Sequence, residues 1–147
     1  MKIYLAADHG GYKLKEKLKR WLEDEGMEIV DKGAMEYERE DDYVDYAVKV
    51  AEEVGKDEAA RGIVLCRNGV GMDIVSNRHR GVRCVLGFDK KQVIKAREDD
   101  DVNVLSLPAD YIGWRLSKKL VKVFLETKFK EKKRYQRRLD KLKGVGV

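Results

Sequence analysis

The chain has 147 residues, of which 43% are hydrophobic and 40% charged, and its formal net charge is +5. This length predicts one domain over residues 1–147, and no apolar run is long enough to span a membrane. The first residues enter a strand-like run without a signal-peptide pattern. Because only two cysteines are present, a disulfide framework is excluded and a cytoplasmic protein with reduced thiols is expected.

Apolar runs and helical stripes alternate along the sequence. In chain order they predict a strand over 2–7, a helix over 12–25, a strand over 27–30, a helix over 43–55, a strand over 63–65, a helix over 72–77, a strand over 82–88, a helix over 91–98, a strand over 102–107, and helices over 111–127 and 132–142. Five strand–helix units predict a doubly wound α/β/α sandwich with a five-stranded parallel sheet, Rossmann-like, and an extra C-terminal helix. Ligands of such folds bind at the carboxyl ends of the strands.

The most informative stretch is 62–72, where an apolar strand ends on Cys66 and a turn with Gly69 and Gly71 leads into a helix. Such a turn exposes backbone N–H groups at a helix start, which attract anions and developing negative charge. The same field is expected to favour the thiolate of Cys66. Two interpretations remain open for Cys66. It could be a small buried hydrophobic residue, or it could act as a base or nucleophile. A Cys–His hydrolase would need the side chain of His9 within hydrogen-bond distance of Cys66.

The chain has two histidines, His9 and His79. His79 lies between two arginines and is expected to be solvated, whereas Asp8 and His9 follow the first strand directly and two glycines come next. A histidine there could donate to a phosphate or a sugar hydroxyl, or act as general acid or base. The alternative is a turn histidine bonded to a carbonyl group. Cys84 is expected in the core, and the dispersed cysteines and histidines predict no metal site.

The last predicted helix is strongly basic. Arg134 and Arg138 are four residues apart and share one face, which suits a phosphate group. Taken alone, the two arginines are better explained as two charges among many on a solvated face. Nucleic-acid binding is the least favoured explanation, because no aromatic residues interleave the basic run to stack bases.

Seven segments occur in the order found in one known family, and together they span nearly the whole chain. They are 8–15, 42–47, 62–72, 77–83, 96–98, 103–105 and 134–140. In this ordered set the chain closely resembles the ribose-5-phosphate isomerase B family, which also holds the galactose-6-phosphate isomerase subunits. The resemblance implies a homodimer, sometimes a tetramer, with active sites shared between subunits. It also implies cofactor-free and metal-free aldose–ketose isomerisation of a sugar phosphate through a cis-enediolate, with ribose 5-phosphate and ribulose 5-phosphate as the default pair.

The resemblance also assigns roles to residues. Cys66 matches the family's proton-transferring cysteine. Another branch of the family uses a glutamate instead, at the position of Met72 here, and methionine cannot accept a proton, which leaves Cys66 as the base. The remaining matches are substrate-binding: Asp8, His9 and Asp100 for the sugar, Gly69, Val70 and Gly71 for the oxyanion, and Arg134 and Arg138 for the phosphate.

Four positions depart from the family pattern. Arg67 replaces a glycine, which could narrow the pocket or add a substrate contact, and Asn68 replaces a hydroxyl residue that assists the chemistry. Asp99 replaces the ring-opening histidine and can still accept a proton from the anomeric hydroxyl. Asp110 replaces a phosphate-side arginine, where an anion would repel phosphate. Alternatives are therefore a different sugar phosphate or a non-catalytic sugar-phosphate-binding relative.

Overall fold

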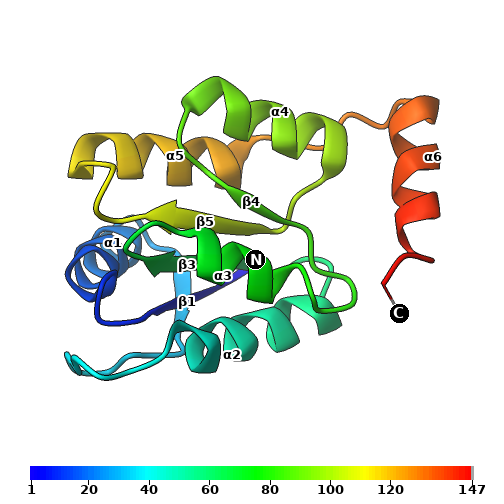
Figure 1. Ribbon diagram of the computed structural model, residues 1–147. Coiled ribbons are helices and arrows are strands. Elements are labelled where there is room, and N and C mark those ends of the chain that lie inside the picture. Colours follow the sequence, from blue (N-terminus) through cyan, green and yellow to red (C-terminus); the bar gives the residue numbers. More distant parts are fainter. Residues whose placement is uncertain (147) are drawn as a thin grey trace.

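The computed structural model of the protein describes residues 1–146, and strands and helices alternate along them (Figure 1). The elements in chain order are β1 (Lys2–Ala7), α1 (Tyr12–Asp24), β2 (Glu28–Asp31), α2 (Tyr43–Lys56), β3 (Arg61–Cys66), α3 (Val70–Ser76), β4 (Cys84–Leu86), α4 (Lys90–Asp100), β5 (Val104–Pro108), α5 (Trp114–Glu126) and α6 (Lys133–Leu142). Every predicted element is present. Among the described residues, no helix is long and apolar enough to cross a membrane.

The strands form one parallel sheet in the order β2-β1-β3-β5-β4. The predicted five-stranded parallel sheet is therefore confirmed. Ala7 of β1 is in register with Leu65 of β3, and Cys66 of β3 is in register with Pro108 of β5. The segments that follow these three strands consequently begin side by side at the carboxyl edge of the sheet.

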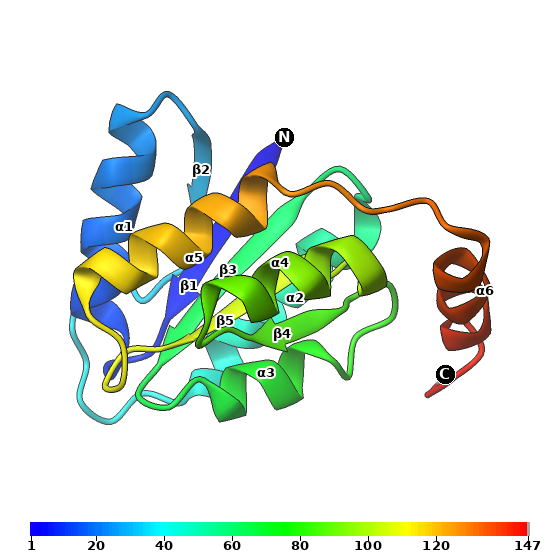
Figure 2. The same ribbon diagram turned by 90° about the horizontal axis from the view of Figure 1, so that it is seen from above.

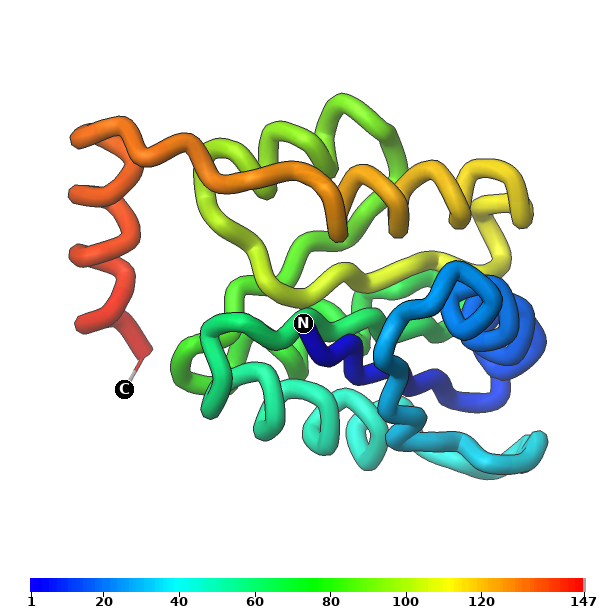
Figure 3. The backbone as a smooth tube through the Cα atoms, turned by 180° about the vertical axis from the view of Figure 1, so that it is seen from behind, coloured from blue at the N-terminus to red at the C-terminus, as the bar shows by residue number. Residues whose placement is uncertain are grey.

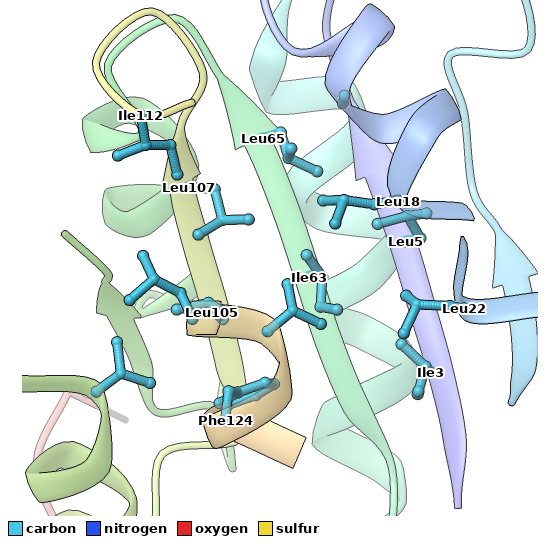
Figure 4. Packing of buried hydrophobic residues seen from close by; sticks show 14 of the residues in the cluster. Ile3, Leu5, Leu18, Leu22, Ile63, Leu65, Leu105, Leu107, Ile112 and Phe124 are labelled. Carbon is cyan, nitrogen blue, oxygen red and sulfur yellow. The ribbon is translucent and has the colours of Figure 1, made fainter. Parts of the chain in front are cut away.

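Helices cover both faces of the sheet, as the doubly wound prediction requires (Figure 2). Alternation along β3 divides its side chains between the two faces. Ile63 and Leu65 join the core under α1, α4 and α5, where Figure 4 shows them near Leu18 and Leu107. Val64 and Cys66 point to the opposite face and pack with α2 and α3. Cys66 is thereby placed against the start of the short helix α3.

Strand β4 is shorter than predicted, with three residues instead of the run 82–88. It lies at the sheet edge and pairs with β5 alone. The backbone N–H of Val82 donates to the carbonyl of His79 inside a turn, so the strand cannot begin there. Phe88, at the other end, is 60% exposed. Cys84 is therefore the first residue of its strand and only partly buried, which corrects its expected place in the core.

Helix α6 stands apart from the sandwich (Figures 1 and 3). Its one buried residue is Tyr135, and its contacts are with α4. The preceding linker is fixed to the end of α4, because the N–H of Lys130 donates to the carbonyl of Glu98 at 2.9 Å. The basic face of α6 therefore lies beyond the amino edge of the sheet rather than over the carboxyl edge.

Candidate active site

The sulfur of Cys66 sits inside the turn that joins β3 to α3. Gly69 has a left-handed backbone with φ of 73°, which closes the turn and which glycine adopts without strain. The N–H of Gly69 donates to Sγ of Cys66 at 3.2 Å, and the N–H groups of Met72 and Asn68 also favour the charged sulfur. The predicted main-chain N–H groups are thus present, and that of Gly69 donates to the thiol itself.

Burial nevertheless dominates the ionisation of this thiol. Cys66 is 5% exposed, and burial raises its pKa above the ordinary value, with the negative charge of Asp8 adding to the rise. The N–H groups of Met72, Gly69 and Asn68 only partly offset these effects. The expectation of a favoured thiolate is therefore wrong for the free protein.

Asn68 and two glycines shape the rest of the turn. The Asn68 side chain accepts the N–H of Val70 at 3.0 Å and lies 3.9 Å from Sγ of Cys66. A side chain at Gly71 would come within 2.7 Å of the Tyr43 ring, so that ring closes one side of the turn. Asn68 thus holds a polar group beside the thiol, and the absence of a Cβ at Gly71 lets α2 approach.

Asp8 is the carboxylate next to the thiol. It is 5% exposed and follows β1, the neighbour of β3. Burial raises its pKa, although its Oδ1 accepts N–H groups from Gly11 at 3.2 Å and Gly10 at 2.9 Å. Asp8 and Cys66 are therefore two buried ionisable groups with raised pKa values, and the charge of Asp8 acts on the thiol.

The His9 ring is held by Asp41, which the sequence did not single out. Nδ1 of His9 lies 2.7 Å from Oδ1 of Asp41, and the backbone N–H of His9 donates to the same oxygen at 3.0 Å. The alternative of a turn histidine bonded to a carbonyl is therefore wrong. With Nδ1 engaged, Nε2 is the nitrogen left for a ligand. Within residues 1–146, Asp8, His9 and Asp41 are also the one set of acidic and imidazole ligands close enough to hold a metal ion, with ligand atoms within 4.8 Å.

Two of the positions that depart from the family pattern meet in space. Nη1 of Arg67 lies 3.4 Å from Oδ2 of Asp110, and the N–H of Asp110 donates to the carbonyl of Arg67 at 2.9 Å. Asp110 is therefore not the isolated anion that the sequence suggested, because Arg67 supplies its counter-charge.

Four predicted site residues lie away from Cys66 in the same chain: Asp99, Asp100, Arg134 and Arg138. The carbonyl of Asp100 accepts from Arg83, just before β4, which places the end of α4 at the amino edge of the sheet. Strand β5, which begins there and ends beside Cys66, has five residues and so spans roughly 15 Å. One copy of the chain does not bring all predicted residues together.

Asp99, Arg134 and Arg138 nonetheless lie on two helices that pack together. Arg134 and Arg138 lie over the ring of Tyr135, at 4.8 Å and 5.9 Å from its centroid, and α6 packs on the helix that carries Asp99. Oδ1 of Asp99 is buried without a hydrogen-bond partner. This second cluster therefore presents two guanidinium groups and one unsatisfied carboxylate.

A thiol, a carboxylate and an imidazole at the ends of adjacent parallel strands define an α/β enzyme that moves protons on a small polar substrate. Comparison with known proteins agrees. The family model described as Ribose/Galactose Isomerase matches residues 3–142, and the chain belongs to this family. The predicted resemblance to ribose-5-phosphate isomerase B is thereby confirmed.

Individual relatives cover nearly the whole chain. A Bacillus subtilis protein named putative sugar phosphate isomerase YwlF is 36% identical over 142 residues, covering 97% of this chain and 95% of the relative. A Thermotoga maritima ribose 5-phosphate isomerase structure superposes with a TM-score of 0.92 at 40% identity, covering 98% of both chains. Ribose-5-phosphate isomerase B from Mycoplasma genitalium, with bound ribulose-5-phosphate, has a TM-score of 0.92 at 35% identity and covers 97% of this chain and 93% of that one.

Proposed function

We propose that this chain interconverts ribose 5-phosphate and ribulose 5-phosphate, with Cys66 moving the proton between the first two carbons. The observation that carries the proposal is the Cys66 sulfur, set among main-chain N–H groups and next to Asp8. The bound ribulose-5-phosphate of the Mycoplasma genitalium relative supports the choice of substrate.

The chemistry begins with the thiol proton. Asp8 takes this proton, and the thiolate of Cys66 then removes the proton from the second carbon of the open-chain aldose. The C–H electrons form the carbon–carbon double bond, and the carbonyl oxygen becomes an oxyanion at the turn of Gly69, Val70 and Gly71. In the free protein the N–H of Gly69 donates to Sγ of Cys66 and that of Val70 to Asn68, and both turn to the oxyanion when it forms. Preorganised donors at such a position contribute most of the stabilisation in reactions of this kind. Cys66 returns its proton to the first carbon while a proton passes from the second oxygen to the first.

The substrate contacts are divided between two edges of the sheet. Asp8 and His9 bind the sugar at the carboxyl edge, and Asn68 assists beside the thiol. At the amino edge, Asp99 accepts the anomeric proton during ring opening, Asp100 binds the sugar, and Arg134 and Arg138 bind the phosphate. Because the two groups lie at opposite edges of one chain, the active enzyme is a homodimer, or a tetramer of such dimers, in which each site takes residues from both copies. The two free cysteines fit a cytoplasmic enzyme.

The proposal is tested by comparing the two cysteines. Cys66→Ala is expected to lower turnover of ribose 5-phosphate by about 10³-fold or more, because it removes the acid–base group. Cys84→Ala is the matched control and should retain turnover. Deuterium exchange at the second carbon in D₂O, followed by NMR, measures the same step directly.

Retained exchange in Cys66→Ala would remove this residue as the base. A panel of four- to six-carbon sugar phosphates identifies the substrate. Faster turnover of another member would replace ribose 5-phosphate as the substrate. Binding without turnover of any member would identify a non-catalytic sugar-phosphate-binding relative.

A further inference from the structure

The side chain of Arg67 rests its aliphatic stem on the loop after β1 and leaves its end exposed. A Cβ placed on Gly10 would collide with Cγ of Arg67 and would lie 3.0 Å from its backbone nitrogen. The aliphatic stem therefore packs directly over the loop that follows β1. Because Gly10 adjoins His9, this packing fixes the first half of the Arg67 side chain beside the proposed sugar contacts.

The loop after β5 holds Arg67 from the other side. The N–H of Asp110 donates to the carbonyl of Arg67, and the N–H of Ala109 donates to the carbonyl of Cys66, both at 2.9 Å. These backbone bonds set the spacing between the thiol turn and the Asp110 carboxylate. Arg67 is thus anchored at its backbone and along its stem, and only the guanidinium remains free to move.

The ion pair at the end of this side chain is weak. Nη1 of Arg67 is 3.4 Å from Oδ2 of Asp110, and the side chains are 62% and 45% exposed. Exposed pairs of this kind contribute little, since water and salt screen them. A phosphate dianion offers more charge and a bidentate geometry that a guanidinium matches well, so it can displace the carboxylate.

The charges around the thiol make such an exchange useful. Asp8 and Asp41 are nearly buried carboxylates at the site, and both would repel an incoming dianion. Arg67 is a cation on the same turn as Cys66, and its stem packs on Gly10, the residue whose N–H donates to Asp8. We propose that Arg67 anchors the phosphate of the substrate at the mouth of this turn, alongside Arg134 and Arg138 contributed by the second copy of the chain, and that Asp110 is a counter-ion from which Arg67 is released when the substrate binds.

This inference rests on the proposed function for its substrate, and a double-mutant cycle tests it. KM and kcat for ribose 5-phosphate are measured for the wild type, Arg67→Gln, Asp110→Asn and the double variant. Arg67→Gln is expected to raise KM about 10-fold, as expected for loss of a charge-assisted contact, with a smaller change in kcat. Asp110→Asn is expected to lower KM a few-fold, because the competing carboxylate is gone, and this gain should vanish in the Arg67→Gln background.

Two outcomes of the cycle overturn the inference. An unchanged KM in Arg67→Gln means that Arg67 does not hold the substrate. An equal gain from Asp110→Asn in both backgrounds means that Asp110 simply repels phosphate, without acting through Arg67. Arg20→Gln removes an exposed arginine of α1 and is the charge-matched control, for which KM should stay at the wild-type value.

A binding measurement separates this inference from the proposed catalysis. Calorimetric titration of each variant with ribose 5-phosphate and with ribose requires no turnover. Arg67→Gln should weaken ribose 5-phosphate binding about 10-fold and leave ribose binding unchanged, because ribose carries no anion. Equal weakening of both ligands would overturn the anion-anchoring role even in an enzyme that isomerises another sugar phosphate.

Discussion

The two edges of the sheet use charged residues in opposite ways. At the amino edge, Arg97 is 4% exposed and fully engaged, with Nη1 2.7 Å from Asp101 and Nε donating to the carbonyl of Thr127 at 3.1 Å. At the carboxyl edge, the Cys66 thiol and the Asp8 carboxyl are also buried, yet both have raised pKa values. The charge of Arg97 is neutralised and holds α4 to the following segments, whereas the ionisable groups around Cys66 lack such a counter-charge.

The largest effect is expected from breaking the amino edge. Arg97→Ala leaves the carbonyls of Thr127 and Val102 without their side-chain donor, which costs about 2–4 kcal/mol for two unsatisfied acceptors. Asp101 keeps its bond from Arg83. Urea unfolding measures the loss. Arg78→Ala, at an exposed arginine, is the control and should change the free energy of unfolding by no more than about 0.5 kcal/mol. A loss in Arg97→Ala no larger than that of the control would contradict the structural role assigned to Arg97.

The sequence could predict the fold because the alternation of short apolar runs and helical stripes is a local signal. The sequence could also place Cys66 and His9 together at the carboxyl edge of the sheet, because the ends of parallel strands lie side by side. The partners of these residues could not be found in the same way. Asp41 is 32 residues from His9, in an acidic loop without periodicity, and Asp110 is 43 residues from Arg67. The raised pKa of Cys66 was missed because burial depends on α2 and α3 packing over the turn.

A smaller effect is expected at α6, where a change in KM would show that residues of the amino edge contribute to the active site. Arg134→Ala is expected to raise KM for ribose 5-phosphate about 10-fold, through loss of a phosphate contact. Arg137→Ala changes an arginine of α6 that lines a separate hollow with Gln136 and Lys141, and should leave KM unchanged. An unchanged KM in Arg134→Ala would mean that Arg134 does not bind the phosphate and is one of the solvent-exposed charges of α6.

Mixing variants tests the shared site directly. Cys66→Ala and Arg134→Ala/Arg138→Ala are each impaired alone. In random mixed dimers with sites built from both copies, one site in each mixed dimer is intact, which restores about a quarter of wild-type activity. Absence of recovery after confirmed subunit exchange would show that each site belongs to one chain.

The smallest effect is expected from the negative charge of Asp8, which acts on the pKa of the Cys66 thiol. Burial and Asp8 both raise the pKa of Cys66. The rate of its alkylation by iodoacetamide should therefore be low at neutral pH and should still increase with pH above the ordinary pKa of a thiol. Asp8→Asn removes the negative charge and keeps the side-chain shape, so the rate profile should move to lower pH. This measurement uses the free enzyme and is independent of substrate binding, and Cys66→Ala provides the background from Cys84. A profile that moved to higher pH in Asp8→Asn would mean that Asp8 favours the thiolate. The carboxyl group would then stabilise the charged thiol instead of receiving its proton.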